Sequence, residues 1–254
     1  LIPHPKFDLL LLAPFNSLEK ASEAVSAIFR AGITPSAMEL MEIDAITLAT
    51  KMLDSTAFPL TEGLAAHLII EVDGNNMDVL MNEMEAISEV LANYEVGELY
   101  FADDAQQKNE LWKIRRKANE AAVAAGYTIE EDTVVPRAEL PKLIKGVKAL
   151  GEAKGFKVVC YGHAGDGNLH IRINHPTIKK SFESEEMKLI LNELFKLIHT
   201  LGGTISGEHG IGLIQKSFMP VMFDAISMDL MRGIKKTFDP NGILNAGKIF
   251  DQNN

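Results

Sequence analysis

The sequence predicts an α+β fold built from ferredoxin-like βαββαβ units, with an antiparallel sheet and helices on one face. Short apolar runs alternate with longer segments whose apolar residues recur at helical spacing. If a short helix after Ile43 is set aside, the first hundred residues give the order strand, helix, strand, strand, helix, strand. That is the ferredoxin-like order. The second half of the chain repeats most of it.

The first half has recognisable element boundaries. The apolar strand that begins the chain is followed by Asn16 or Ser17, either of which can cap a helix, and Gly32 ends that helix. Asp73-Gly74 marks a turn. The predicted elements are strands at 7–15, 36–43, 67–72 and 95–101, and helices at 18–30, 44–53 and 76–93.

The second half gives the same kinds of element and a tail. We predict helices at 104–125, 140–154, 183–201 and 224–238, and strands at 128–135, 157–161 and 169–173. Pro240-Asn241-Gly242 ends the last helix. We therefore expect two halves, 1–101 and 102–225, followed by a tail at 226–254.

Composition excludes several classes of partner. The 254 residues carry 35 acidic against 25 basic side chains, a formal net charge of -10. Such a surface repels nucleic acid and anionic membranes, so neither is expected as a partner. The single cysteine, Cys160, cannot form an intrachain disulfide, which fits a reducing compartment. No apolar run approaches the roughly 20 residues of a membrane span, so we expect a cytoplasmic protein.

The densest cluster of chemically useful residues is the segment 161–170, Tyr-Gly-His-Ala-Gly-Asp-Gly-Asn-Leu-His. It joins two predicted strands, so a hairpin would bring His163 and His170 to one mouth, where both could bind a divalent metal. The alternative is that both histidines are ordinary partners in a polar, glycine-rich turn.

A second glycine-rich loop, 206–212, offers the carboxylate of Glu208 and the imidazole of His209. Imidazoles with one carboxylate suit zinc, iron or manganese rather than calcium. Both loops read G-x-x-G-x-G, the reverse of the dinucleotide fingerprint, so neither predicts a pyrophosphate site.

Two further groups are weak signals by themselves. Arg115 and Arg116 are adjacent on a predicted helix, and one of them could bind a substrate carboxylate through two parallel hydrogen bonds. From the residues alone, a solvated helix face is the better interpretation. Asn245 and Lys248 are polar residues near the end of the tail, where polar residues are usually uninformative.

Taken together and in order, the stretches 161–170, 206–212 and 238–248 resemble the C-terminal domain of FAD-linked oxidases. That family includes the flavoprotein component of glycolate oxidase, D-lactate dehydrogenase and D-2-hydroxyglutarate dehydrogenase. The segments 68–74 and 111–116, with Glu131-Asp132 and Val135-Pro136, are similar to it as well. The resemblance extends along essentially the whole chain, 1–254.

The resemblance implies roles for four residues of the two glycine-rich loops. His163, His170 and Glu208 match positions that bind a divalent metal, often zinc. His209 matches the residue proposed as the catalytic base, which would take the proton of the substrate hydroxyl.

It also implies how the substrate and the flavin are bound. Arg115 matches the arginine that binds the substrate carboxylate, and Asn245 and Lys248 match a tail that packs against the flavin. Two polar residues that help to bind substrate in the hydroxyglutarate enzymes match Asn119 and Glu130. An acid at position 130, where that branch has a lysine, disfavours a second substrate carboxylate, so we expect lactate or glycolate.

The implied function is oxidation of a 2-hydroxyacid to a 2-oxoacid, with hydride passing to FAD. Family members hold FAD mostly in an N-terminal domain of the vanillyl-alcohol oxidase type. The missing phosphate loop and the start at Leu1 lead us to expect that this domain lies outside the given chain, which alone would be inactive. The expected partners are the flavin domain, a small 2-hydroxyacid, an electron acceptor that would allow a peripheral membrane location, and a second copy in a homodimer.

Two other functions stay open from the residues themselves. A metal held by His163, His170 and Glu208 with an open position could activate water, which would make the chain a metal-dependent hydrolase. Tandem ferredoxin-like units could also form a non-catalytic module that binds a small molecule.

Overall fold

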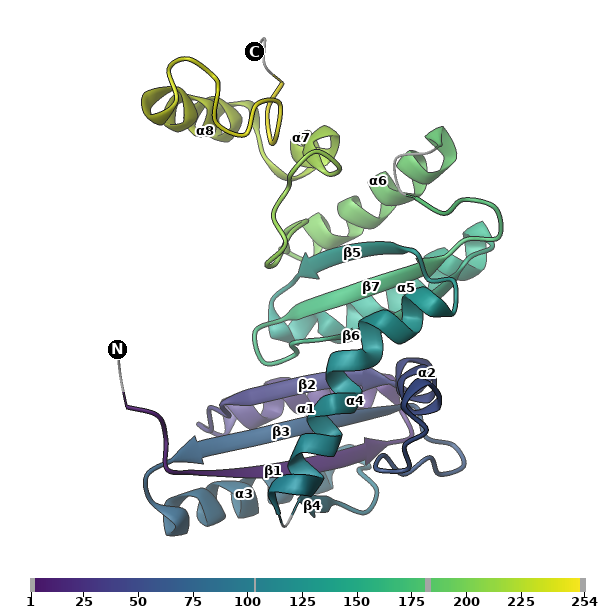
Figure 1. Ribbon diagram of the computed structural model, residues 1–254, viewed down its shortest axis with the longest axis vertical. Coiled ribbons are helices and arrows are strands. Elements are labelled where there is room, and N and C mark those ends of the chain that lie inside the picture. The colour runs from purple at the N-terminus through teal and green to yellow at the C-terminus, as the bar shows by residue number, and fades with distance from the viewer. Residues whose placement is uncertain (1–2, 103, 181–183, 252–254) are drawn as a thin grey trace.

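The computed structural model describes residues 3–102, 104–180 and 184–251, and across these residues the strands form a seven-stranded antiparallel sheet. The strand order is β4-β1-β3-β2-β6-β7-β5 (Figure 1). The strands are β1 Phe7–Phe15, β2 Ala37–Glu42, β3 Ala66–Gly74, β4 Tyr100–Ala102, β5 Ile129–Val134, β6 Lys157–Gly162 and β7 Asn168–Asn174. The helices are α1 Leu18–Arg30, α2 Ile43–Leu53, α3 Met77–Leu91, α4 Ala105–Ala124, α5 Leu140–Lys154, α6 Glu185–Thr200, α7 Met219–Met222 and α8 Ala225–Phe238. The predicted α+β class with an antiparallel sheet is confirmed.

The sheet consists of two similar sets of strands. The first unit, β1 to β4, has the order β4-β1-β3-β2, in which the first and third strands are central, as in ferredoxin-like folds. The second unit, β5 to β7, repeats three of these four positions as β5-β7-β6. A single bridge between Val134 and Thr204 lies on the free side of β5, where a fourth strand would pair.

A short ladder between β2 and β6 joins the two units. Its register pairs Leu40 with Gly162 and Met41 with Tyr161. Beyond Met41 the side chain of Glu42 continues the pairing, because its carboxylate accepts the N–H of Cys160 at 2.8 Å. Burial raises the pKa of Glu42, although Lys148 binds the same carboxylate. This ladder and its flanking residues form the seam between the units.

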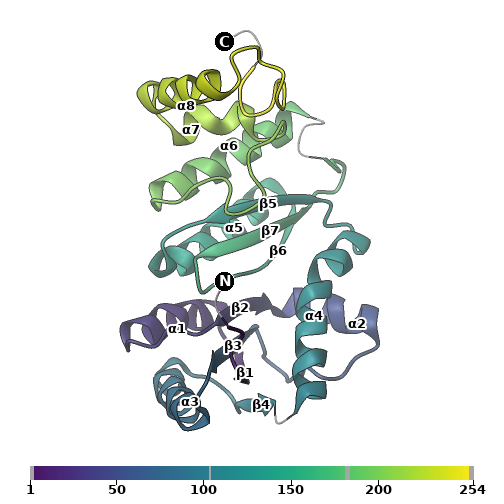
Figure 2. The same cartoon turned by 60° about the vertical axis from the view of Figure 1, so that its left-hand side comes forward.

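Helices cover both faces of the sheet, but unequally (Figure 2). The helices α1, α3, α5 and α6 pack on one face over a single apolar cluster, as the sequence led us to expect. The helices α2 and α4 pack on the other face, over Leu10, Leu12 and Ile69 of the first unit. The prediction of helices on one face misses this second layer, because the apolar pattern of a helix does not tell which face of the sheet it covers.

Most predicted elements match the structure to within two residues, and β4 is the main exception. We predicted a strand at 95–101, but only Tyr100–Ala102 is a strand, preceded by a single bridge between Phe15 and Val96. Pro14 lies opposite this stretch, where its carbonyl accepts the N–H of Gly97 at 2.8 Å. Since proline has no N–H to return, the ladder is interrupted there. The predicted helix start at 183 lies outside the described residues, and α6 begins at Glu185.

The tail lies beyond the second unit, where α7, α8 and the loop after α8 extend past α6 (Figure 1). Large apolar side chains of α8 are solvent-exposed at every fourth position, a spacing that places them on one side of the helix. These residues, called here the α8 stripe, are Ile226, Leu230, Ile234 and Phe238. Within the described ranges, no helix combines the length and the apolar composition needed to cross a bilayer.

Candidate functional site

The α4-bearing face of the sheet becomes polar in the second unit, and there the candidate site is built. His170 of β7 lies between Asp132 of β5 and Tyr161 of β6 in the strand register. His163 follows Tyr161 by two residues, and residues two apart along a strand point to the same side. The predicted hairpin therefore does bring the two imidazoles together, with ring centroids 5.7 Å apart.

Asp132 anchors the second glycine-rich loop to this face. Its Oδ2 accepts the main-chain N–H groups of Glu208 at 2.7 Å and His209 at 2.8 Å. Its Oδ1 accepts the side-chain amide of Asn168 at 2.6 Å. Burial opposes ionisation of this carboxyl, but the hydrogen bonds from these three residues outweigh it and lower its pKa. The ionised carboxylate of Asp132 thus fixes the main chain at Glu208 and His209, from which their side chains project.

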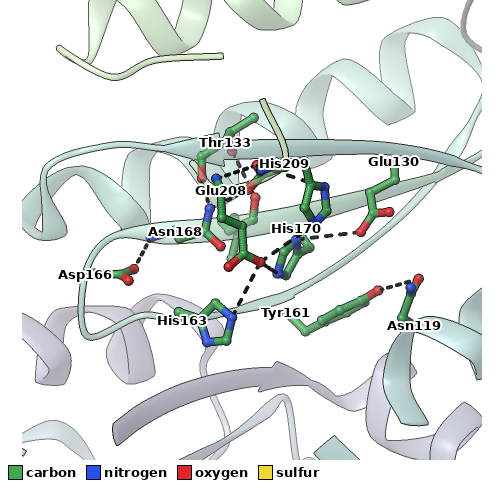
Figure 3. A network of polar contacts seen from close by, with 12 residues as sticks. Asn119, Glu130, Thr133, Tyr161, His163, Asp166, Asn168, His170, Glu208 and His209 are labelled. Atoms are coloured by element: carbon green, nitrogen blue, oxygen red, sulfur yellow. Dashed lines mark hydrogen bonds and ion pairs between the residues drawn. The ribbon is translucent and has the colours of Figure 1, made fainter. Parts of the chain in front are cut away.

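Three imidazoles converge on the carboxylate of Glu208 (Figure 3). Its Oε1 lies 3.5 Å from Nε2 of His170 and 3.7 Å from Nε2 of both His163 and His209. In a tetrahedral zinc site with bonds of 2.0–2.2 Å, neighbouring ligand atoms are about 3.3 Å apart. Oε1 of Glu208 is a few tenths of an ångström beyond this separation from both histidines, and the donor atoms of His163, His170 and Glu208 all lie within 4.8 Å of one another, so the three residues could hold a divalent metal.

The protonation state of His170 suits metal binding, whereas that of His163 depends on Glu39. Burial, and then the charge of Arg115, lowers the pKa of His170 to about 4, so this imidazole is neutral at neutral pH. The hydrogen bond from His163 to Glu39 raises the pKa of His163. Metal ligation needs an unprotonated nitrogen, which His170 offers at once. Its Nδ1 is buried and, within the part of the chain that the structure describes, has no hydrogen-bond partner.

Arg115 lies beside this cluster rather than on a solvated helix face. It projects from α4, is 9% exposed, and its guanidinium carbon lies 5.4 Å from the ring centre of Tyr161. Its Nε donates to Glu39 at 2.7 Å. Its Nη2 is buried and has no partner among the described residues. The assignment of Arg115 to a substrate carboxylate stays a prediction, and the geometry leaves one of its donors unused.

A second polar group borders the imidazoles. Arg172 of β7 donates to Glu130 at 2.6 Å and also bonds to Asn119 and the hydroxyl of Tyr161. Glu130 also lies 3.6 Å from Nδ1 of His170. A pocket of about 420 Å³, lined by Glu130, Arg172 and His209 among others, opens next to these groups. Because its carboxylate is paired with Arg172, Glu130 is a poorer candidate for a metal ligand than Glu208.

The predicted flavin-contacting residues lie in the tail. Asn245 and Lys248 occupy the loop after α8, in the tail (Figure 1). Lys248 donates to the side-chain oxygen of Asn245 at 3.2 Å. The next residue, Ile249, donates its N–H to the carbonyl of Gly212 at 2.8 Å, so the tail contacts the glycine-rich loop that carries Glu208 and His209. The flavin-contacting role of Asn245 and Lys248 stays a prediction.

Sequence reasoning missed Glu39, Arg172 and Asn168 as members of the site, and it gave Asp132 no role. Glu39 and Arg172 lie in alternating strand patterns that look like ordinary half-buried strands. The available signal was their charge, because residues of these types are rarely buried unless they are paired. Nothing in the sequence tells which partner each would find.

Comparison with known proteins places this arrangement in a family. Residues 4–249 match the family model described as FAD linked oxidases, C-terminal domain. The chain belongs to this family. The resemblance noted in the sequence is thereby confirmed over nearly the whole chain.

Curated relatives include a D-lactate dehydrogenase of Anaerostipes hadrus, 32% identical over 98% of this chain and 53% of that protein. The glycolate oxidase subunit GlcD of Bacillus subtilis is 31% identical over 98% of this chain and 52% of its own length. The GlcD subunit of Escherichia coli strain K12 is 32% identical over 98% of this chain and 49% of its own length. The chain therefore spans about half the length of the relatives it matches.

Solved structures share the fold at low sequence identity. Substrate-bound p-cresol methylhydroxylase superposes with a TM-score of 0.70 at 15% identity, covering 100% of this chain and 55% of that one. Alkyldihydroxyacetonephosphate synthase gives a TM-score of 0.58 at 14% identity, and the match covers 96% of this chain and 45% of that one. At these identities the likeness concerns the fold alone.

Proposed function

We propose that this chain is the substrate-binding and catalytic portion of a flavin-dependent dehydrogenase that oxidises a small 2-hydroxyacid such as lactate or glycolate. The observation that carries the proposal is the convergence of three imidazoles on one carboxylate oxygen, in a chain of the FAD-linked oxidase family. The similarity to a D-lactate dehydrogenase and to glycolate oxidase subunits supports the substrate class.

His163, His170 and Glu208 would hold a divalent metal, for which zinc is the simplest choice given two imidazoles and a carboxylate. When bound, the metal supplies positive charge that stabilises the developing alkoxide of the substrate. The protein keeps the site ready by burying His170 as a neutral imidazole and by fixing the main chain at Glu208 through Asp132.

His209 would take the proton of the substrate hydroxyl. Its side chain is half exposed, with Nε2 3.7 Å from Oε1 of Glu208, so a substrate hydroxyl held beside Glu208 would come within its reach. An imidazole suits this task because its ring nitrogen can accept a proton from a hydroxyl and release it again. Arg115 would bind the substrate carboxylate through the donor that Glu39 leaves unused.

A substrate with one carboxylate fits the remaining polar groups best. The pocket of about 420 Å³ beside His209 contains one strongly buried arginine, Arg172. Its guanidinium is already bonded to Glu130, Asn119 and Tyr161. A second substrate carboxylate bound at Arg172 would have to displace Glu130, which supports lactate or glycolate over a dicarboxylate.

The flavin would come from a segment outside this chain. The relatives are about twice as long as the chain, and the α8 stripe leaves a row of apolar side chains without cover. Exposed apolar patches of this kind mark interaction surfaces. We infer that the flavin-carrying domain packs against α8, with Asn245 and Lys248 directed to the flavin, which supplies the hydride acceptor.

The test uses the full-length protein with its flavin bound, mixed anaerobically with lactate, glycolate or 2-hydroxyglutarate. Lactate or glycolate should bleach the oxidised flavin faster than 2-hydroxyglutarate. His209→Ala should slow bleaching roughly 10²–10⁴-fold, the usual contribution of a general base, while dithionite still reduces the flavin fully. The control is His199→Ala, an imidazole at the end of α6. Unchanged bleaching in the His209 variant would refute the base, and ester hydrolysis by this chain without flavin would favour a hydrolase.

A further inference from the structure

We propose that Glu39 is a positioning residue that fixes His163 for metal binding and holds Arg115 at a set place beside it. The inference rests on the proposed function, since it concerns the same site. It assigns a role to a residue of the first unit, whereas His163, His170, Glu208 and His209 all belong to the second unit or the loop that follows it.

The strand register places Glu39 next to His163. The β2–β6 ladder pairs Leu40 with Gly162, so one step further along both strands sets Glu39 beside His163. The contact is close, because Oε1 of Glu39 accepts the Nδ1–H of His163 at 2.6 Å. Oε2 of Glu39 accepts the Nε–H of Arg115 at 2.7 Å. Glu39 itself is only 5% exposed.

The first consequence concerns the tautomer of His163. A neutral imidazole carries one proton, and a carboxylate acceptor at Nδ1 keeps the proton there. Nε2 then has a free lone pair, and this nitrogen is the one that faces Glu208 at 3.7 Å. Carboxylates that accept from a metal-binding histidine orient the ring, and their loss typically weakens metal affinity about 10–100-fold.

The second consequence concerns Arg115. A buried carboxylate shared between a cation and an imidazole gives both partners a fixed distance from each other, which neither helix α4 nor the β6–β7 turn could set alone. With Nε held by Glu39, the unpartnered Nη2 of Arg115 remains for a ligand. Glu39 therefore links the group that would bind the metal to the group that would bind the substrate carboxylate.

Two buried acidic residues lie at the seam between the units, and they have different partners. Glu39 and Glu42 are both acidic residues of β2 that are buried against the second unit, at 5% and 6% exposure. Glu42 bonds to Lys148 and the N–H of Cys160, which are structural partners. Glu39 alone of the pair contacts the imidazole cluster. Glu42→Gln is therefore a matched control for the cost of removing a buried carboxylate from this strand.

The experiment measures zinc affinity by competition with a chromogenic chelator, in the wild-type chain, Glu39→Gln and Glu42→Gln. We expect Glu39→Gln to weaken zinc binding about 10–100-fold, and Glu42→Gln to leave it unchanged. In a His163→Ala background, Glu39→Gln should cause no further loss, because its effect acts through His163. Equal zinc affinity in the wild type and Glu39→Gln would overturn the inference.

A second readout needs no metal. Long-range ¹H–¹⁵N NMR spectra of the zinc-free chain at a pH where His163 is neutral should show its proton on Nδ1, and Glu39→Gln should mix the two tautomers. A wild-type chain that binds no zinc would count against the proposed function, while the tautomer still decides the role of Glu39. If Glu39→Gln does not fold, Glu39→Asp, which keeps the charge on a shorter side chain, gives the same comparison.

Discussion

The two units of the sheet present opposite chemistry on the same face. In the first unit, Leu10 and Leu12 of β1 point to this face and are fully buried under α4. In the second unit, the strand in the corresponding position, β5, presents Glu130 and Asp132. The neighbouring strands differ in the same way, because Leu12 lies opposite Ile69 of β3, whereas Asp132 lies opposite His170 of β7.

The difference shows how one fold serves both stability and chemistry. A ferredoxin-like unit needs one face buried under its own helices, and both units meet that need on the shared apolar layer of α1, α3, α5 and α6. Their second face can therefore vary. In the first unit α2 and α4 cover it with apolar contacts, and in the second unit it stays partly open and carries paired polar groups.

The strongest way to break this comparison is to place an acid on the covered face. Leu12→Asp would bury a carboxylate without a partner between α4 and the sheet. We expect a loss of about 4–5 kcal/mol or more in the free energy of unfolding, enough to unfold the chain. Leu12→Met, which keeps the volume, should cost less than about 1.5 kcal/mol. Urea denaturation followed by circular dichroism measures both, and a folded Leu12→Asp variant would show that the face is not closed.

On the open face of the second unit, the buried acid Asp132 is expected to stabilise the fold. Asp132→Asn would remove the charge that accepts the N–H groups of Glu208 and His209, so we expect a loss of about 3 kcal/mol and weakened zinc binding. Because the pKa of Asp132 is lowered in the folded state, its contribution is present above the unfolded pKa near 4 and is lost as pH falls through the folded value. Asp166→Asn, at an exposed acid of the neighbouring turn, is the control. Equal urea midpoints for the two variants would argue against an anchoring role for Asp132.

Glu131 sharpens the comparison because it points to the helix-covered face of the same strand. Burial raises its pKa from 4.5 to about 8, and Gln215 donates to it at 2.7 Å. Because the folded state binds this proton more tightly than the unfolded state, the contribution of Glu131 to the stability of the fold is fully present below the unfolded pKa. It is lost as the pH rises toward 8. Glu131→Gln should therefore raise stability at pH 7 by about 2–3 kcal/mol and leave it nearly unchanged at pH 4. Thermal melts across this range test it, and a Glu131→Gln variant less stable at pH 7 would contradict it.

The smallest effect on the isolated chain is expected in the tail. Leu230→Glu changes an exposed residue of the α8 stripe, so the stability of this chain should move by no more than about 0.5 kcal/mol. The same change should weaken binding of a separately expressed flavin domain, measured by calorimetry. Thr237→Glu, at an exposed non-stripe position of α8, makes the same change in charge and serves as the control. A marked fall in the melting temperature of Leu230→Glu would mean that α8 already buries this residue.

The sequence predicts the element order well because that order follows from local signals. The strand at 7–15 and the helices at 18–30 and 140–154 agree with the structure residue for residue, since capping residues and glycines mark their ends. The strand at 95–101 was overestimated because its partner in the ladder, Pro14, is distant in sequence. The position of α4 on the second face likewise depends on packing that no local pattern shows.

The sequence predicts which residues gather at the candidate site, but not the residues that hold them in place. His163, His170, Glu208 and His209 lie in two glycine-rich loops that are visible in the sequence, and the structure brings them together. Glu39 lies 124 residues before His163 in the sequence, and the pairing of β2 with β6 brings the two side chains into contact. Supports of this kind depend on strand pairing, which sequence spacing does not specify.

The central claim is that the open face of the second unit binds a metal through His163, His170 and Glu208. The most direct measurement is the metal content of the purified wild-type chain after zinc loading and desalting, compared with a His163→Ala, His170→Ala double variant and a His199→Ala control. We predict about one zinc per chain in the wild type and the control and none in the double variant. Zinc retained in the double variant, or lost equally from the control, would contradict the claim.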